Sequence, residues 1–135
     1  MSRSSPGSFA LGAAALSGAA AAALAFALRN AAADTTSWAV TGFLAMALPA
    51  IASGTWLARE HGRTGPAFLV ALGTGWLLRA AFLAAVVVAA LRRGSSAVSG
   101  ALLGLAVGFV ALTAFEMLWF ARRSRAGSLP TRRGA

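Results

Sequence analysis

The sequence predicts an all-α protein: a polytopic membrane protein with four transmembrane helices in a small antiparallel bundle. The first observation is composition, since 59% of the 135 residues are hydrophobic and only 11% are charged. The second is arrangement, because the hydrophobic residues fall in four runs, each close to the about 20 residues that span a bilayer. The third is that most charged residues lie between or after these runs. Together these features argue against a soluble globular domain.

The first predicted span covers residues 9–28 and follows a short polar leader. A basic start, an apolar run and small residues at 31–33 are also typical of a cleavable secretory signal. The run is longer than the usual signal core of about 7–15 residues, which favours a retained membrane helix. A cleaved signal, which would leave three spans, is the alternative.

The second predicted span covers residues 38–57 and follows a polar connection. Just before it, side-chain oxygens of the kind that cap the free N–H groups at a helix start are offered by Asp34, Thr35, Thr36 and Ser37. Within the span, Pro49 cannot donate a backbone hydrogen bond to the carbonyl of Ala45. We therefore expect a kink at Pro49 that serves either helix packing or function.

The third and fourth predicted spans cover residues 67–91 and 97–121. Residues 92–96 form a connection so short that the two helices must be antiparallel neighbours. The remaining residues, 122–135, form a basic segment containing Gly and Pro. We expect this segment to be a disordered cytoplasmic tail close to the membrane surface.

A row of glycines marks one face of the fourth span. Gly100, Gly104 and Gly108 follow one another at four-residue spacing, which places them nearly in line along a helix. Small residues in such a row allow two backbones to approach closely in lipid. The row therefore predicts a helix contact, either within this chain or with another chain.

The arginines predict the orientation in the membrane. All twelve basic residues are arginines, and the formal net charge is +9. With four spans, eight arginines share the side of both termini and three lie on the other side. The positive-inside rule then places both termini in the cytoplasm, as in a multi-pass protein of the bacterial cytoplasmic membrane. Because these charges flank apolar segments, we expect anionic lipids as partners and no nucleic acid.

The residue types offer little for catalysis. The chain has no cysteine, and its single histidine, His61, lies among the charges of the connection at 58–65. We expect His61 to be solvated, since no second histidine or acid cluster completes a site. The sequence therefore predicts a protein that is not an enzyme and has no cofactor or metal site.

Two charged residues lie inside the predicted spans. Arg79 is near the middle of the third span, where a cation normally faces the bundle interior, a cavity or a partner chain. Gly75 lies one turn before it on the same face and leaves room for another backbone. Glu116 lies closer to the cytoplasmic end of the fourth span. Counted from the predicted span ends, Arg79 is about 13 residues deep and Glu116 about 5, an offset of about 12 Å.

This offset leaves three alternatives for the two charges. Arg79 and Glu116 pair directly, Glu116 turns toward the cytoplasmic boundary, or a partner chain supplies the missing group. The offset favours the second alternative over direct pairing. It also motivates the hypothesis that Arg79 engages an acidic group of another membrane protein.

Several short patterns resemble the ATP synthase protein I family of small four-helix membrane proteins. They are LAMALP in the second span, a polar turn with arginine and histidine, and a glycine six residues before a cation in the third span. Gly73 and Arg79 would carry the family's glycine and cation, and the resemblance covers about residues 37–120. The family's acid beside this glycine is replaced by Thr74, and its asparagine after the second-span proline is replaced by Ala50.

The resemblance implies an accessory role in assembling the rotor ring of an F-type ATP synthase. The implied partners are the rotor subunits, helical hairpins that carry a membrane carboxylate, and the implied partner-binding residues are Gly73, Gly75, Arg79 and Glu116. Divalent-ion transport is also proposed for the family, but the two departures affect the residues that it would use. The alternatives are a small cation or multidrug transporter and a structural subunit of another membrane complex, as a homo- or hetero-oligomer.

Overall fold

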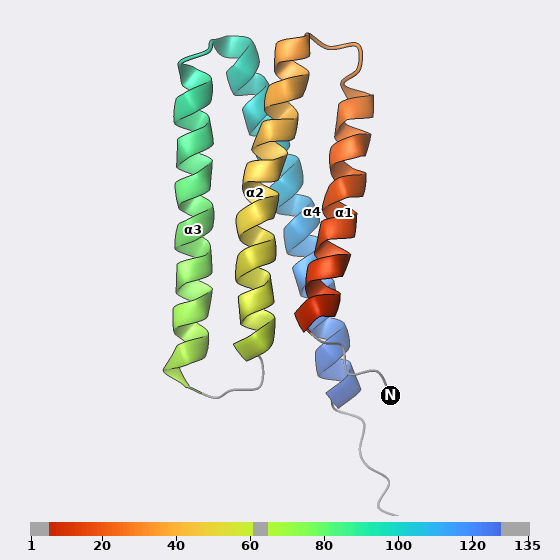
Figure 1. The fold of residues 1–135 in the computed structure, drawn as a ribbon, viewed down its shortest axis with the longest axis vertical. Helices are drawn as coiled ribbons and strands as arrows, with labels where there is room; N and C mark the ends of the chain where they lie inside the picture. Colours follow the sequence, from red (N-terminus) through yellow and green to blue (C-terminus); the bar gives the residue numbers. More distant parts are fainter. Residues whose placement is uncertain (1–5, 61–64, 128–135) are drawn as a thin grey trace, which may run out of the picture.

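The structure is a computed structural model that describes residues 6–60 and 65–127. These residues form four α-helices: α1 (Pro6–Ala27), α2 (Ala33–Glu60), α3 (Pro66–Leu91) and α4 (Ser95–Gly127). Each helix is long and apolar enough to cross a membrane, and successive helices are antiparallel (Figure 1). The predicted all-α, multi-pass membrane fold is therefore confirmed.

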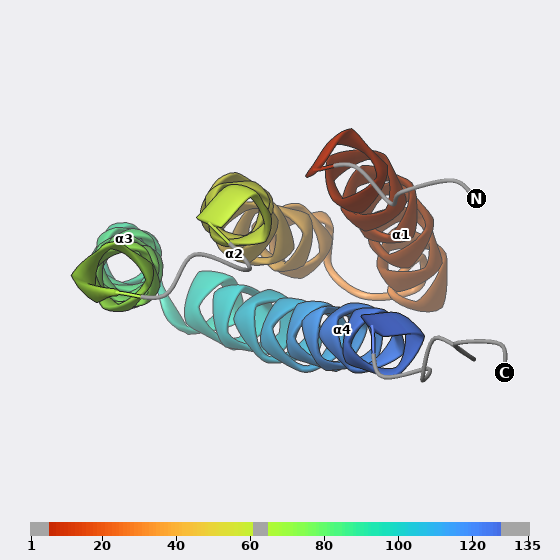
Figure 2. The ribbon, with the colours of Figure 1, turned by 90° about the horizontal axis from the view of Figure 1, so that it is seen from below.

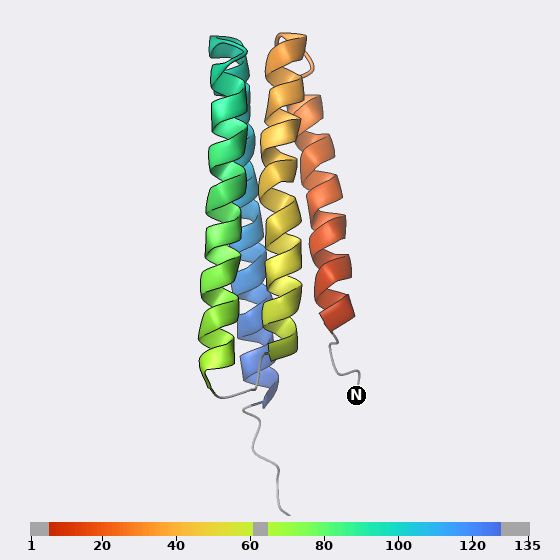
Figure 3. The ribbon, with the colours of Figure 1, turned by 60° about the vertical axis from the view of Figure 1, so that its left-hand side comes forward.

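The four helices form a row of three with the fourth laid across it. Figure 2 shows α3, α2 and α1 side by side, with α4 running obliquely over one face of this row from α3 toward α1. As a result α2 packs against all three other helices, whereas α1 and α3 do not touch each other. Figure 3 shows the same arrangement from the side. The second helix continues through the buried Pro49 as one element, Ala33–Glu60.

The centre of the bundle is the interface between α2 and α4, and the glycine row of α4 lies in it. A Cβ added at Gly100 or Gly104 would collide with the carbonyl oxygen of Thr35 or Ala39 on α2, and one at Gly108 would lie 3.1 Å from Cβ of Met46. The row therefore packs within this chain. The same region contains the main core of buried apolar side chains, which comprises Leu24, Ala39, Phe43, Met46, Ala47, Ala50, Leu105 and Leu112.

The first helix is held by aromatic contacts at the end of the bundle where the chain begins. Phe9 is 1% exposed, and its ring centroid lies 5.5 Å from that of Phe115 and 5.1 Å from that of Trp119. Removal of α1 as a cleaved signal would uncover both α4 rings. Retention of the first helix stays a prediction, and Phe9 would then keep these two rings covered.

The helices differ from the predicted spans mainly at their ends. The second helix begins at Ala33, so Asp34 and Thr35 lie in its first turn and do not precede it. The fourth helix continues to Gly127, so the prediction of a disordered tail is wrong for residues 122–127. Arginine and alanine favour helix, and Arg123 places its guanidinium carbon 5.0 Å from the Trp119 ring centre. The rest of the predicted tail, 128–135, lies outside the described residues, as does His61.

Two short connections, between α1 and α2 and between α3 and α4, lie at the end of the bundle away from the start of α1 and the end of α4. There the α3–α4 connection turns at Gly94, whose φ of 116° is in the left-handed region that glycine adopts most readily. Ser96 then donates a 3.1 Å hydrogen bond to Oδ2 of Asp34, which ties this turn to the start of α2. Figure 1 shows the start of α1 and the end of α4 at the opposite end.

Candidate functional site

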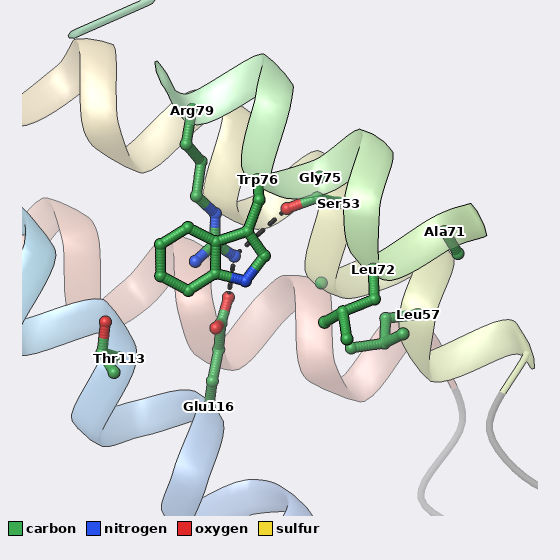
Figure 4. A pocket seen from close by; sticks show the side chains of 10 residues that line it. Ser53, Leu57, Ala71, Leu72, Gly75, Trp76, Arg79, Thr113 and Glu116 are labelled. Carbon is green, nitrogen blue, oxygen red and sulfur yellow. Dashed lines mark hydrogen bonds and ion pairs between the residues drawn. The ribbon is translucent and has the colours of Figure 1, made fainter. Parts of the chain in front are cut away.

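The two intramembrane charges meet between three helices. Arg79 of α3 forms an ion pair with Glu116 of α4 through Nη2, and the same nitrogen donates a 3.1 Å hydrogen bond to Oγ of Ser53 on α2 (Figure 4). Ser53 can accept because its own hydroxyl donates to the carbonyl of Ala50 at 3.3 Å. Both charged side chains are largely buried, with 13% of Arg79 and 19% of Glu116 exposed.

The favoured expectation, that Glu116 turns toward the membrane boundary, is wrong, because Glu116 pairs directly with Arg79. That expectation took the end of the fourth helix to be residue 121, but α4 continues to Gly127. Arg79 lies 13 residues after Pro66, and Glu116 lies 11 residues before Gly127. Counted from the real helix ends, the two depths differ by about two residues, or about 3 Å. The two side chains can therefore meet.

Two glycines allow the three helices to approach at this point. A Cβ at Gly75 of α3 would lie 2.8 Å from Cβ of Ser53, so the contact between α3 and α2 needs the glycine. A Cβ at Gly54 of α2 would lie 2.5 Å from the Phe9 ring and 3.3 Å from Oε1 of Glu116. The sequence identified Gly75 but not Ser53 or Gly54. A polar Ser–Gly pair inside an otherwise apolar span is the signal that could have identified them.

The charges line a small pocket that is open on one side. Its volume is about 70 Å³. The pocket lies where α3 and α4 have separated: they touch near the turn, through Ala90 and Ala97, and α4 then crosses away toward α1 (Figures 1 and 2). We call it the α3–α4 opening; its lining residues are Ser53, Gly54, Leu57, Ala71, Leu72, Gly75, Trp76, Arg79, Thr113 and Glu116.

The guanidinium of Arg79 is only partly satisfied. It carries five N–H donors, and one nitrogen, Nη2, makes both of its hydrogen bonds to the described residues. Its Nε is buried and has no hydrogen-bond partner among them. Burying an unsatisfied donor costs about 1–3 kcal/mol. Nη1 also makes no hydrogen bond to the described residues and is not enclosed like Nε, so it is the donor that a further acceptor in the α3–α4 opening could reach.

The remaining predicted site residues lie elsewhere. A Cβ at Gly73 would meet nothing within 4 Å, so this glycine faces away from its neighbours and does not join the opening. The glycine row of α4 packs against α2, and Pro49 is a buried residue of α2. Within residues 6–60 and 65–127, no three His, Asp or Glu side chains gather as metal ligands would. The polar side-chain groups that line the opening are one guanidinium, one carboxylate, the hydroxyls of Ser53 and Thr113 and the indole N–H of Trp76.

Comparison with known proteins adds no assignment. No protein-family model matches the sequence, and no curated protein or solved structure is significantly similar to it. The resemblance to ATP synthase protein I therefore enters only as a proposal.

Proposed function

We propose that this protein is an accessory subunit of a membrane complex and that it receives a carboxyl-bearing helix of its partner in the α3–α4 opening. The observation that carries the proposal is the half-satisfied Arg79, which faces this opening from within a membrane-spanning helix. Intramembrane charges are costly, so they are retained mainly where they serve a function.

A protonated carboxyl group fits the opening without adding charge to it. Its carbonyl oxygen can accept a hydrogen bond from Nη1 of Arg79, which makes none to the described residues, and its hydroxyl can donate to Glu116, whose pairing with Arg79 uses Oε1. The pair stays neutral overall, so no further ion needs to be desolvated. Leu72 and Trp76, which are 39% and 56% exposed, supply apolar surface for the helix that carries the group.

The partner that we propose is the rotor subunit of an F-type ATP synthase, and the role is assistance in rotor-ring assembly. A rotor hairpin carries a carboxyl group at mid-membrane depth, which is the group that the opening suits. Short-lived binding of this group before ring closure would guide assembly. The resemblance of residues 37–120 to ATP synthase protein I supports the same partner.

The chain offers a direct test because it has no cysteine of its own. We expect a photoactivatable crosslinker attached after Leu72→Cys, at the opening, to capture rotor subunits in native membranes. Leu77→Cys is the matched control, since Leu77 lies on the same helix, is 73% exposed and does not line the opening. Equal capture from both positions, or capture from neither, would contradict the proposal.

We further propose that the protein resides in the bacterial cytoplasmic membrane with both termini in the cytoplasm. In the structure, Arg59, Arg122, Arg123 and Arg125 lie at the end of the bundle that holds the start of α1 and the end of α4. A reporter enzyme fused after Ala135 should be active only if it functions in the cytoplasm. If a reporter that is active only after export is active at this position, the proposed topology is wrong.

A further inference from the structure

A second hollow lies at the opposite end of the bundle from the start of α1 and the end of α4. It is an open groove of about 420 Å³ between the start of α2 and the end of α3. We call it the Trp38 groove; its lining residues are Trp38, Ala85, Val88, Ala89, Arg92 and Arg93. The proposed function makes no use of it.

The groove combines an apolar wall with two cations at its rim. Ala85, Val88 and Ala89 are exposed along the last turns of α3, and Arg92 and Arg93 follow directly where the apolar helix ends. Both arginine side chains are exposed, and neither guanidinium is paired within the described part of the chain. The two positive charges thus lie at the level where a membrane-spanning segment meets lipid head groups.

The indole ring of Trp38, which is amphipathic, forms the remaining wall of the groove. Trp38 is half-buried and packs against the cluster of Ala90, Ala97 and Ala101, which fixes its position between α2 and the α3–α4 turn. Tryptophan prefers the membrane boundary because its ring is apolar while its N–H can bond to head groups or water. The nearest acid in this region, Asp34, already accepts a hydrogen bond from Ser96 and is not part of the lining.

We propose that the Trp38 groove binds an anionic phospholipid. The phosphate lies against Arg92 and Arg93, and the upper part of one acyl chain covers Ala85, Val88 and Ala89. Two unpaired guanidinium groups select a head group with net negative charge, because a zwitterionic head group brings a cation of its own toward them. The apolar wall selects a lipid over a free phosphate ester, which would leave that wall uncovered.

Quenching of Trp38 fluorescence tests this proposal. In a variant with Trp56, Trp76 and Trp119 replaced by Phe, Trp38 is the only tryptophan. The protein is reconstituted in vesicles that contain either phosphatidylglycerol or phosphatidylcholine with brominated acyl chains. We expect stronger quenching at equal mole fraction by brominated phosphatidylglycerol. Each arginine near an anionic lipid surface contributes about 1 kcal/mol, so the preference should fall about fivefold per arginine removed.

Two comparisons make the result specific to the groove. Arg92→Gln with Arg93→Gln should abolish the preference and leave quenching by brominated phosphatidylcholine unchanged, which shows that the fold is intact. Arg29→Gln is the matched control, because Arg29 belongs to the same end but packs over Phe26 at 4.2 Å outside the lining. A preference that survives the double substitution, or is lost equally with Arg29→Gln, overturns the proposal. Relief of quenching by 1 mM glycerol phosphate also overturns it, because the site would then belong to a free phosphate ester.

Discussion

Replacing Gly104 by leucine is expected to prevent the bundle from forming. Even the Cβ of an alanine would overlap the Ala39 carbonyl oxygen and lie 2.8 Å from the backbone nitrogen of Phe43. These are backbone atoms of α2, so no change of side-chain conformation can relieve the overlap. Overpacking typically costs about 1–3 kcal/mol, which we expect for Gly104→Ala, and leucine should exceed that range. The measurement is thermal unfolding in detergent together with the yield of monodisperse protein.

Gly73 provides the matched control for this substitution. It is also a glycine in a membrane-spanning helix, but a Cβ there would meet nothing within 4 Å. Gly73→Leu should therefore change the free energy of unfolding by no more than about 0.5 kcal/mol, as is usual at surface positions. If Gly104→Leu unfolds like Gly73→Leu, the α2–α4 interface is not as close as described.

The sequence predicted this contact but not its partner. Four-residue spacing of Gly100, Gly104 and Gly108 marks a packing face from local information alone. The helix that covers this face is determined by how α4 lies across the other three helices. The order and lengths of the helices in the sequence do not determine that arrangement. The complementary Gly42 of α2, whose Cβ would collide with the Ala101 carbonyl oxygen, does not stand in a four-residue row and so gave no comparable signal.

Direct pairing of the two charges was one of three alternatives, and the sequence favoured another one because it misplaced a helix end. Hydrophobicity ends near residue 121, whereas α4 continues to Gly127 because its arginines are good helix formers. The apparent end of the span is therefore not the end of the helix. Placing the end six residues too early made Glu116 seem much shallower than Arg79. The four spans depended only on the number and length of apolar runs, which is why they could be predicted.

Breaking the charge pair from one side is expected to be strongly destabilising. Glu116→Gln leaves Arg79 buried without a counter-charge, and loss of one partner of a buried pair costs about 3–5 kcal/mol. Removing both charges, with Arg79→Leu and Glu116→Leu together, should restore stability to within about 1 kcal/mol of the original or above it, because neither ion is then desolvated. The coupling is measured from the free energies of unfolding of three variants: Arg79→Leu alone, Glu116→Leu alone, and the two substitutions together.

An additive result would contradict the pair. If the cost in the double variant equals the sum of the costs of Arg79→Leu and Glu116→Leu alone, the two side chains do not interact. Recovery of stability in the double variant instead provides a folded protein that lacks the chemistry of the α3–α4 opening.

That folded double variant allows the most direct test of the proposed function, because it separates loss of binding from loss of structure. The measurement is copurification of F-type ATP synthase rotor subunits from the same membranes with the original protein and with the Arg79→Leu, Glu116→Leu double variant. We predict that the original protein recovers rotor subunits and that the double variant, although folded, recovers at most about a tenth as many, since loss of about 1.4 kcal/mol lowers affinity tenfold. Equal recovery of rotor subunits with both proteins would contradict the claim that the Arg79–Glu116 pair receives a partner's carboxyl group.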